Sequence, residues 1–116
     1  METIKFKAGA LVKLKVNISS DANVGSNVSL NDRVVKKSIT NNFYVELGVI
    51  DNIDGQVLSV VSNFFVKGGN IDTIMETTHV VNTVYSDSTS KEISSDKVKL
   101  SPALFTAYSV VELKKI

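Results

Sequence analysis

A strict alternation of apolar and polar side chains restricts the fold of this chain more than any other feature of its sequence. Every second position of the segment ALVKLKVNI (residues 10–18) is apolar, and two lysines and an asparagine occupy three of the four positions between them. A period of two over nine residues is typical of a β-strand with one buried and one solvated face. Residues 3–7 predict a short partner strand, with a bend at Ala8-Gly9 between the two.

Three later runs, residues 43–51, 56–66 and 71–85, also predict β-strands. The first alternates, the third is rich in β-forming Thr, Val and Ile, and the second is apolar on both faces, which predicts a central strand covered on both sides. Asp54-Gly55 between apolar runs is a strong hairpin signal and predicts a positive φ at Gly55. The three runs therefore predict an antiparallel meander.

The same alternation predicts which side chains form the core. The residues that we expect to be largely buried are Val12, Leu14, Val16, Phe43, Val45, Leu47, Val60, Phe64 and Val81.

A short helix is predicted near residues 102–108. Ser101-Pro102 resembles a helix start, with serine as the N-cap and proline at the first helical position. Leu104 and Tyr108 keep helical spacing, so the alternative is a helix that continues to Lys115. The shorter helix, followed by a strand at 109–114, is the interpretation that we favour, because Val110 and its neighbours also fit an edge strand.

The length of 116 residues suits one domain spanning 1–116, and the chain contains no cysteine, which excludes disulfides and thiolate chemistry. Together with the strand pattern, this predicts an all-β fold, either an antiparallel β-sandwich or a small β-barrel, SH3-like or Ig-like, with the one short helix near 102–108.

Three segments resemble parts of SH3-like small barrels. Residues 6–12 (FKAGALV) are similar to the opening strand of these barrels, and residues 47–51 (LGVID), followed by Gly55 and Val57, are similar to their Gly-Val-Ile hairpin. Residues 94–100 resemble the short closing strand. The resemblance implies a small barrel and carries over no functional residue.

Membrane insertion and secretion are not expected. Lys5, Lys7, Lys13 and Lys15 interrupt every apolar stretch near the start of the sequence, so no signal peptide is recognised, and no apolar run is long enough for a membrane-spanning helix. The expected location is the cytoplasm at synthesis, with a virion as a further candidate.

Candidate catalytic and metal-binding patterns are not found. His79 is the one histidine, which excludes a multi-histidine site. The acidic turn at 51–55 places Ile53 where an EF-hand needs an oxygen ligand. Gly68-Gly69 lacks the residues of a phosphate-binding loop. We therefore expect no enzyme activity, no metal and no cofactor.

Charge is distributed unevenly along the sequence. Residues 1–40 carry a net charge of +4, residues 41–90 of −5 and residues 91–116 of +2. If the fold keeps these segments apart, complementary charges favour head-to-tail association that is sensitive to salt. The alternative is that strands from different segments interleave and their charges mix.

These features predict a structural or interaction module that assembles through protein–protein contacts, including self-association, with a capsid or tail component of a virion as one candidate role. The predicted interaction face consists of Lys13, Lys15, Tyr44, Tyr85 and Tyr108. The alternative is a ligand-binding β module for carbohydrate or nucleic acid. Nucleic acid is not expected, because no aromatic residue interleaves with the lysines on their strand.

Overall fold

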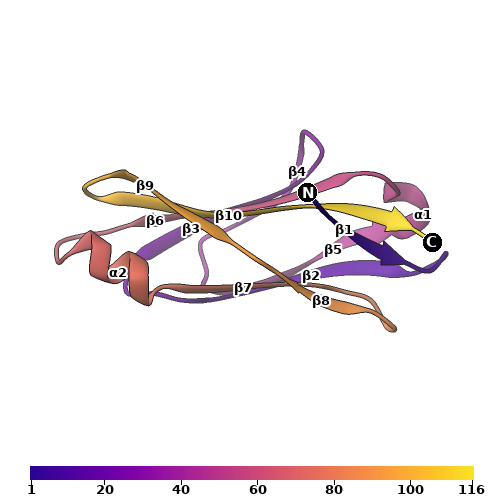
Figure 1. The fold of residues 1–116 in the computed structure, drawn as a ribbon, viewed down its shortest axis with the longest axis horizontal. Helices are drawn as coiled ribbons and strands as arrows, with labels where there is room; N and C mark the ends of the chain where they lie inside the picture. Colours follow the sequence, from indigo (N-terminus) through magenta and orange to yellow (C-terminus); the bar gives the residue numbers. More distant parts are fainter.

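Ten β-strands form two sheets that pack face to face in the computed structural model, which describes residues 1–116 (Figure 1). Sheet A has the order β1 (Glu2–Phe6), β10 (Leu104–Lys115), β6 (Val57–Phe65), β3 (Asn23–Leu30) and β4 (Arg33–Ser38), and β9 (Asp96–Ser101) pairs with β10 beside β1. Sheet B has the order β5 (Asn42–Val49), β2 (Leu11–Ser19), β7 (His79–Tyr85) and β8 (Ser90–Ile93). The predicted all-β fold class is confirmed.

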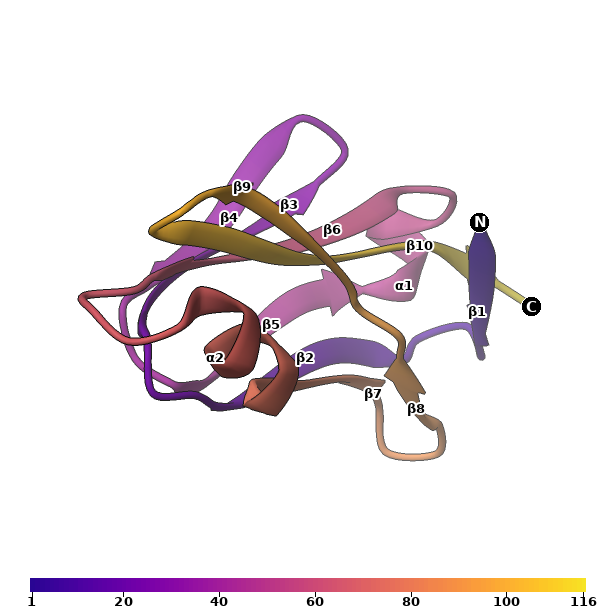
Figure 2. The same ribbon diagram turned by 60° about the vertical axis from the view of Figure 1, so that its left-hand side comes forward.

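Two short helices connect the sheets at opposite ends of the molecule, which measures 48 × 24 × 22 Å (Figures 1 and 2). The helix α1 (Ile50–Ile53) leads from β5 to β6, and α2 (Ile71–Thr77) leads from β6 to β7. Neither helix is long and apolar enough to cross a membrane.

The hydrophobic core lies between the inner faces of the two sheets. Strand β2 contributes Val12, Leu14 and Val16, all fully buried, as its alternation predicts. On sheet A, the rings of Phe64 and Phe105 lie on neighbouring strands and stack with their centroids 4.7 Å apart and their planes 7° from parallel. This aromatic pair lies on two interior strands of sheet A, near the end of β6 and the start of β10.

Most of the predicted core is buried, and the exceptions have clear causes. The residues that are buried as predicted are Val12, Leu14, Val16, Leu47, Val60 and Phe64. Phe43 and Val45 face inward but are only half-buried, because β5 is the edge strand of sheet B. The prediction for Val81 is wrong: β7 begins only at His79, and Asn82 and Val84 are the residues that it turns inward.

The predicted meander is wrong, because β5, β6 and β7 are not neighbours. Strand β6 lies in sheet A, whereas β5 and β7 lie on either side of β2 in sheet B. Gly55 has the predicted positive φ of 80°, but it follows α1 instead of forming a hairpin. Ile50 and Ile53 are both buried, and their spacing of three fits a helical turn that carries the chain between the sheets. The hairpin expected from the SH3-like resemblance is therefore not present.

Two other expectations about the strands are also corrected. Strand β1 pairs in parallel with β10 instead of with β2, so the bend at Ala8-Gly9 carries the chain from one sheet to the other. Strand β6 is covered on its inner face alone, since Phe65 on its outer face is 51% exposed. It is central within its sheet, but no layer packs over its outer face.

A helix replaces the first half of the strand predicted over residues 71–85. The side chain of Asn70 caps α2 by accepting hydrogen bonds from the backbone N–H groups of Asp72 and Thr73, at 2.9 and 3.2 Å. At the other end of α2, Lys97 Nζ donates to the carbonyl oxygens of Met75 and Thr78 at 2.8 and 2.6 Å. These contacts at both ends outweigh the β propensity of the segment.

The helix predicted near residues 102–108 is not present, because this segment is a turn followed by strand β10. Pro102 and Ala103 connect β9 to β10, and Ser101 Oγ accepts a hydrogen bond from the N–H of Ala103. Phe105 and Ala107 then alternate inward along β10. A serine followed by proline can begin a tight turn as well as a helix, and burial of the alternating residues favours the strand.

Candidate interaction surface

Four of the five predicted interaction residues lie together on the outer face of sheet B. Lys15 lies opposite Tyr44 on β5, and Lys13 lies opposite Tyr85 on β7. We call the surface formed by these four residues the lysine–tyrosine face. Tyr108 does not belong to it, because it points outward from sheet A on the other side of the molecule.

The lysine–tyrosine face is mixed in charge. Lys13 lies directly opposite Glu46 on β5, and Glu92 of β8 lies beside Thr83 in the same layer. Strands from different parts of the sequence therefore interleave, as the alternative interpretation of the charges anticipated. Strand β2 is also an interior strand of sheet B, so its lysines cover a face and do not protect an edge.

The outer face of sheet A has a different character, because its three adjacent strands β3, β6 and β10 present a surface without charge. We call it the neutral face, and its residues are Asn23, Gly25, Asn27, Ser29, Val57, Ser59, Val61, Asn63, Phe65, Leu104, Thr106, Tyr108 and Val110. Charged side chains follow at its margins: Glu112 of β10, Lys37 of β4 opposite Asn27, and Asp96 of β9 opposite Tyr108.

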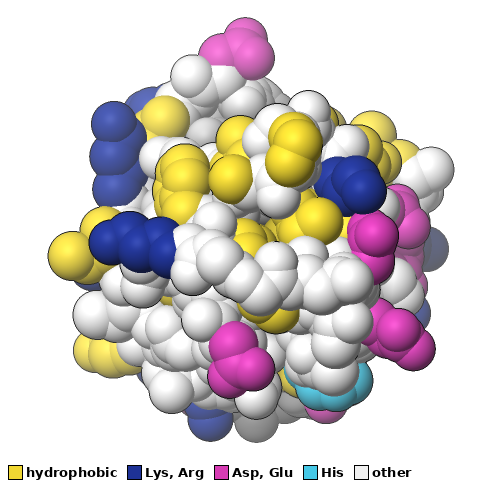
Figure 3. All heavy atoms as spheres, turned by 90° about the vertical axis from the view of Figure 1, so that its left-hand side faces the viewer, with side chains coloured by type: hydrophobic (Ala, Val, Ile, Leu, Met, Phe, Trp, Pro, Cys, Tyr) yellow, Lys and Arg dark blue, Asp and Glu magenta, His cyan; other side chains and the backbone are white.

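Large apolar side chains are exposed on the neutral face. Phe65 is 51% exposed, Tyr108 is 37% exposed, and Val110 is exposed beyond it along β10. Tyr108 lies between Val61 of β6 and Asp96 of β9, and Val98 of β9 extends the apolar surface beside Thr106. Figure 3 shows the end of the molecule that carries α2, where hydrophobic side chains are also exposed.

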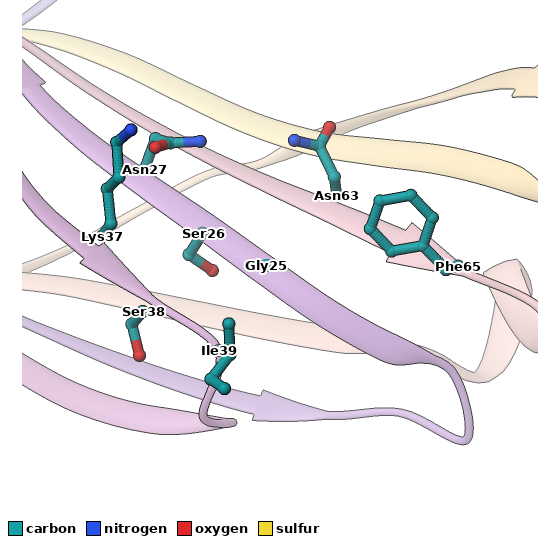
Figure 4. A pocket seen from close by; sticks show the side chains of 8 residues that line it. All are labelled: Gly25, Ser26, Asn27, Lys37, Ser38, Ile39, Asn63 and Phe65. Atoms are coloured by element: carbon teal, nitrogen blue, oxygen red, sulfur yellow. The ribbon is translucent and has the colours of Figure 1, made fainter.

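A shallow groove of about 440 Å³ lies beside Phe65 on the neutral face (Figure 4). Its floor is Gly25 of β3, which lies opposite Asn63 of β6, and a Cβ at Gly25 would meet no atom within 4 Å. The residues that line the groove are Gly25, Ser26, Asn27, Lys37, Ser38, Ile39, Asn63 and Phe65. The groove thus combines an aromatic ring and two amides with one lysine at its rim.

Polar side chains buried between the sheets are held by one another. Asn82 Nδ2 donates to Ser109 Oγ at 3.1 Å, which links sheet B to sheet A, and Ser95 Oγ lies 2.8 Å from Ser109 Oγ. No group of three His, Cys, Asp or Glu side chains is arranged to hold a metal ion. His79, at the start of β7, is exposed. The hydrogen bonds among Asn82, Ser95 and Ser109 therefore have a structural role in joining the two sheets.

The neutral face was missed at the level of sequence, although a signal for it exists. Residues 22–31, 55–66 and 100–111 contain no charged residue, in a chain of which 22% is charged. The fold makes these three segments neighbours in sheet A.

No protein-family model matches the chain, and no curated protein sequence matches it either.

Proposed function

We propose that this protein is a non-catalytic interaction module that assembles with other protein surfaces through the neutral face. The observation that carries the proposal is the set of exposed apolar side chains, Phe65 on β6 and Tyr108 and Val110 on β10, without a charged residue between them on the outer face. The centres of protein interfaces are depleted in charge and enriched in aromatic residues. A contiguous exposed apolar surface on a folded domain is typical of an interaction site.

The comparison between the two outer faces supports this choice. The lysine–tyrosine face carries Lys13, Lys15 and Glu46, whose charges would have to lose water on burial. The neutral face has no such cost, and its hydroxyl and amide groups can form hydrogen bonds at the rim of an interface. Assembly into a capsid or tail of a virion is one setting in which we propose that such a module acts.

Tyr108→Lys is the substitution that tests the proposed interface. Tyr108 lies on the neutral face between Val61 of β6 and Asp96 of β9, so a charge there must be desolvated whenever the face is covered. We expect self-association in sedimentation velocity, or retention of partner proteins from the natural source, to weaken at least about tenfold. Lys15→Glu on the other sheet is the matched control and should change either readout much less. Equal binding by all three proteins would refute the neutral face as the interface.

The groove beside Phe65 favours a second candidate function, the binding of a neutral saccharide. Binding pockets combine apolar or aromatic walls with a few polar groups that fix orientation. The amides of Asn63 and Asn27 can each donate and accept hydrogen bonds, as sugar hydroxyls require, and the ring of Phe65 offers an apolar surface beside them.

Gly25→Val tests the saccharide candidate, because a Cβ at this position meets no atom within 4 Å and the valine side chain would occupy the floor of the groove. Valine favours strands, so thermal unfolding should occur at the same temperature or higher. The wild-type protein first selects a neutral glycan from a panel. We expect the variant to bind this glycan with at least about tenfold lower affinity, because the valine side chain occupies the space that the sugar would fill. Tyr108→Lys should leave this affinity unchanged. Binding of no glycan, or equal binding by both proteins, would exclude the groove as a saccharide site.

A further inference from the structure

The outer edge of β5 carries fewer charged side chains than any other edge strand of the two sheets. Natural β-sheets block pairing at their edges with charges, bulges, short strands or covering elements. Strand β4 carries three basic residues and an irregular register, and β8 has only four residues, two of them charged. Strand β9 is held against α2 by Lys97 and Lys99. By contrast, β5 has eight residues and a single charge, at Glu46, and its register is regular from Asn42 to Glu46 before it shifts at Gly48.

The backbone hydrogen bonds of β2 identify which groups of β5 face this edge. Ile18 N–H donates to the carbonyl oxygen of Asn41 at 2.9 Å, so these two residues form a hydrogen-bonded pair of the antiparallel ladder. Hydrogen-bonded pairs recur at every second residue. The backbone N–H and C=O groups of Phe43 and Val45 therefore point toward β2. The N–H and C=O groups of Tyr44 and Glu46 therefore point away from β2, and β5 pairs with no other strand.

Side-chain exposure also shows that the sandwich is open along β5. Tyr44, on the outer face, is 64% exposed. Phe43 and Val45 point toward the core, yet both are only half-buried because sheet B does not continue beyond them. A further strand at this edge would cover both side chains and satisfy the free backbone groups.

We propose that the strand that covers this edge is β5 of a second copy of the chain, paired antiparallel about a twofold axis at Tyr44. The two four-stranded sheets then form one continuous sheet across the dimer. This inference rests on the proposed function as an assembly module and names a second copy as one of its partners. A twofold axis makes the same surface serve both subunits, so no separate complementary site is needed.

The register follows from the positions of the free backbone groups. Centring on Tyr44 joins Tyr44 to Tyr44 of the partner subunit, and Asn42 to Glu46 of the partner subunit in both directions. Centring on Val45 would align fewer of these outward-facing groups, and centring on Glu46 would place two carboxylates directly opposite each other. At the chosen register Phe43 lies opposite Val45 of the partner subunit on the inner face, and the two tyrosines pair on the outer face.

Tyr44→Cys tests this pairing directly, because the chain contains no cysteine and any disulfide must join two copies. Directly opposed residues of a hydrogen-bonded pair have Cα atoms about 5.5 Å apart, within the range of a disulfide. We expect mild oxidation to give a covalent dimer on a non-reducing gel at least about tenfold faster than for Val34→Cys. Val34, on the edge strand β4, is 49% exposed and is the matched control. Equal rates for the two variants would overturn the proposal.

Tyr44→Pro provides a second test, because it removes an N–H that points to the free edge and leaves the ladder with β2 intact. Wild-type protein and Tyr44→Ala, which keeps the N–H, should sediment as dimers, and Tyr44→Pro as a monomer with an unchanged unfolding temperature. If the proline variant does not fold, the comparison of cross-linking rates between Tyr44→Cys and Val34→Cys decides the question alone. A folded proline variant that still forms dimers would overturn the pairing.

The same measurements separate this inference from the proposed function. Tyr108→Lys should leave the cross-linking of Tyr44→Cys unchanged, because the neutral face lies on the other sheet. If Tyr44→Cys and Val34→Cys cross-link at equal rates while Tyr108→Lys still weakens self-association or partner retention, the β5 dimer is overturned and the neutral face is kept. Specific cross-linking, with binding insensitive to Tyr108→Lys, would keep the dimer and overturn the neutral face.

Discussion

Phe64→Ala is expected to lower the free energy of unfolding by about 3–5 kcal/mol, because it leaves a cavity in the core between the two sheets. Phe64 is fully buried on the central strand β6 and stacks on Phe105 of β10. The loss combines the transfer free energy of the ring with the cost of the empty space that the two sheets cannot close. Denaturant unfolding followed by circular dichroism measures the change.

The neighbouring phenylalanine provides the control for this prediction. Phe65 follows Phe64 in the same strand but is 51% exposed on the neutral face. Phe65→Ala should therefore change the free energy of unfolding by less than about 1 kcal/mol, since little buried surface is lost. A loss well below 1 kcal/mol for Phe64→Ala would show that β6 is wrongly placed at the centre of the core.

Asn82→Asp is expected to make stability strongly dependent on pH. Asn82 is buried between the sheets, and its Oδ1 atom has no hydrogen-bond partner. Burial disfavours the charged carboxylate, so the pKa of the introduced carboxyl should rise well above the value of about 3.9 in the unfolded chain. Since the folded state then holds its proton more tightly, stability is best below about pH 4 and falls as pH rises. Between pH 4 and pH 7 we expect a loss of about 3–4 kcal/mol relative to wild type.

The control for this second prediction is Asn63→Asp, which introduces the same charge on the outer face of β6. A carboxylate at this partly exposed position keeps water, so the difference from wild type should change by less than about 1 kcal/mol over the same pH range. Urea unfolding at several pH values gives both curves. A flat curve for Asn82→Asp would mean that residue 82 is accessible to solvent and does not join the two sheets.

Local alternation predicted the strands well, but it could not predict their partners. The phase of β2 and the inward orientation of Phe43 and Leu47 follow from a period of two, which depends only on neighbouring residues. Which sheet a strand joins depends instead on contacts between distant segments. Successive strands β5, β6 and β7 alternate between the sheets, and no local pattern distinguishes this path from a meander.

The helices show a related limit, because short signals have more than one structural meaning. Asn70 is a good N-cap, but the Thr, Val and Ile residues after it also favour a strand. Lys97, which contacts the last carbonyl groups of α2, lies far from it in the sequence. Ser101-Pro102 fits a helix start equally well as a tight turn, and only the burial of Phe105 beside Phe64 favours the turn and strand.

The candidate surfaces were predictable in part. Lys13 and Lys15 share a face by their spacing alone, but their position beside Tyr44 and Tyr85 required the strand order of sheet B. Tyr108 was grouped with them because the residues around a strand do not show which of the two sheets the strand joins. The neutral face is formed by three uncharged segments, and an absence of charge predicts neither exposure nor adjacency without the topology.

The parallel pairing of β1 with β10 bears on the order in which the protein can fold during translation. Strand β10 is synthesised after every other strand of the two sheets, yet it separates β6 from β1 in sheet A (Figure 1). A nascent chain that has not released β10 from the ribosome leaves β1 without a partner and Phe64 without the ring of Phe105. Loop closure across the whole domain must therefore accompany completion of the core, so the core of sheet A forms only once β10 is available.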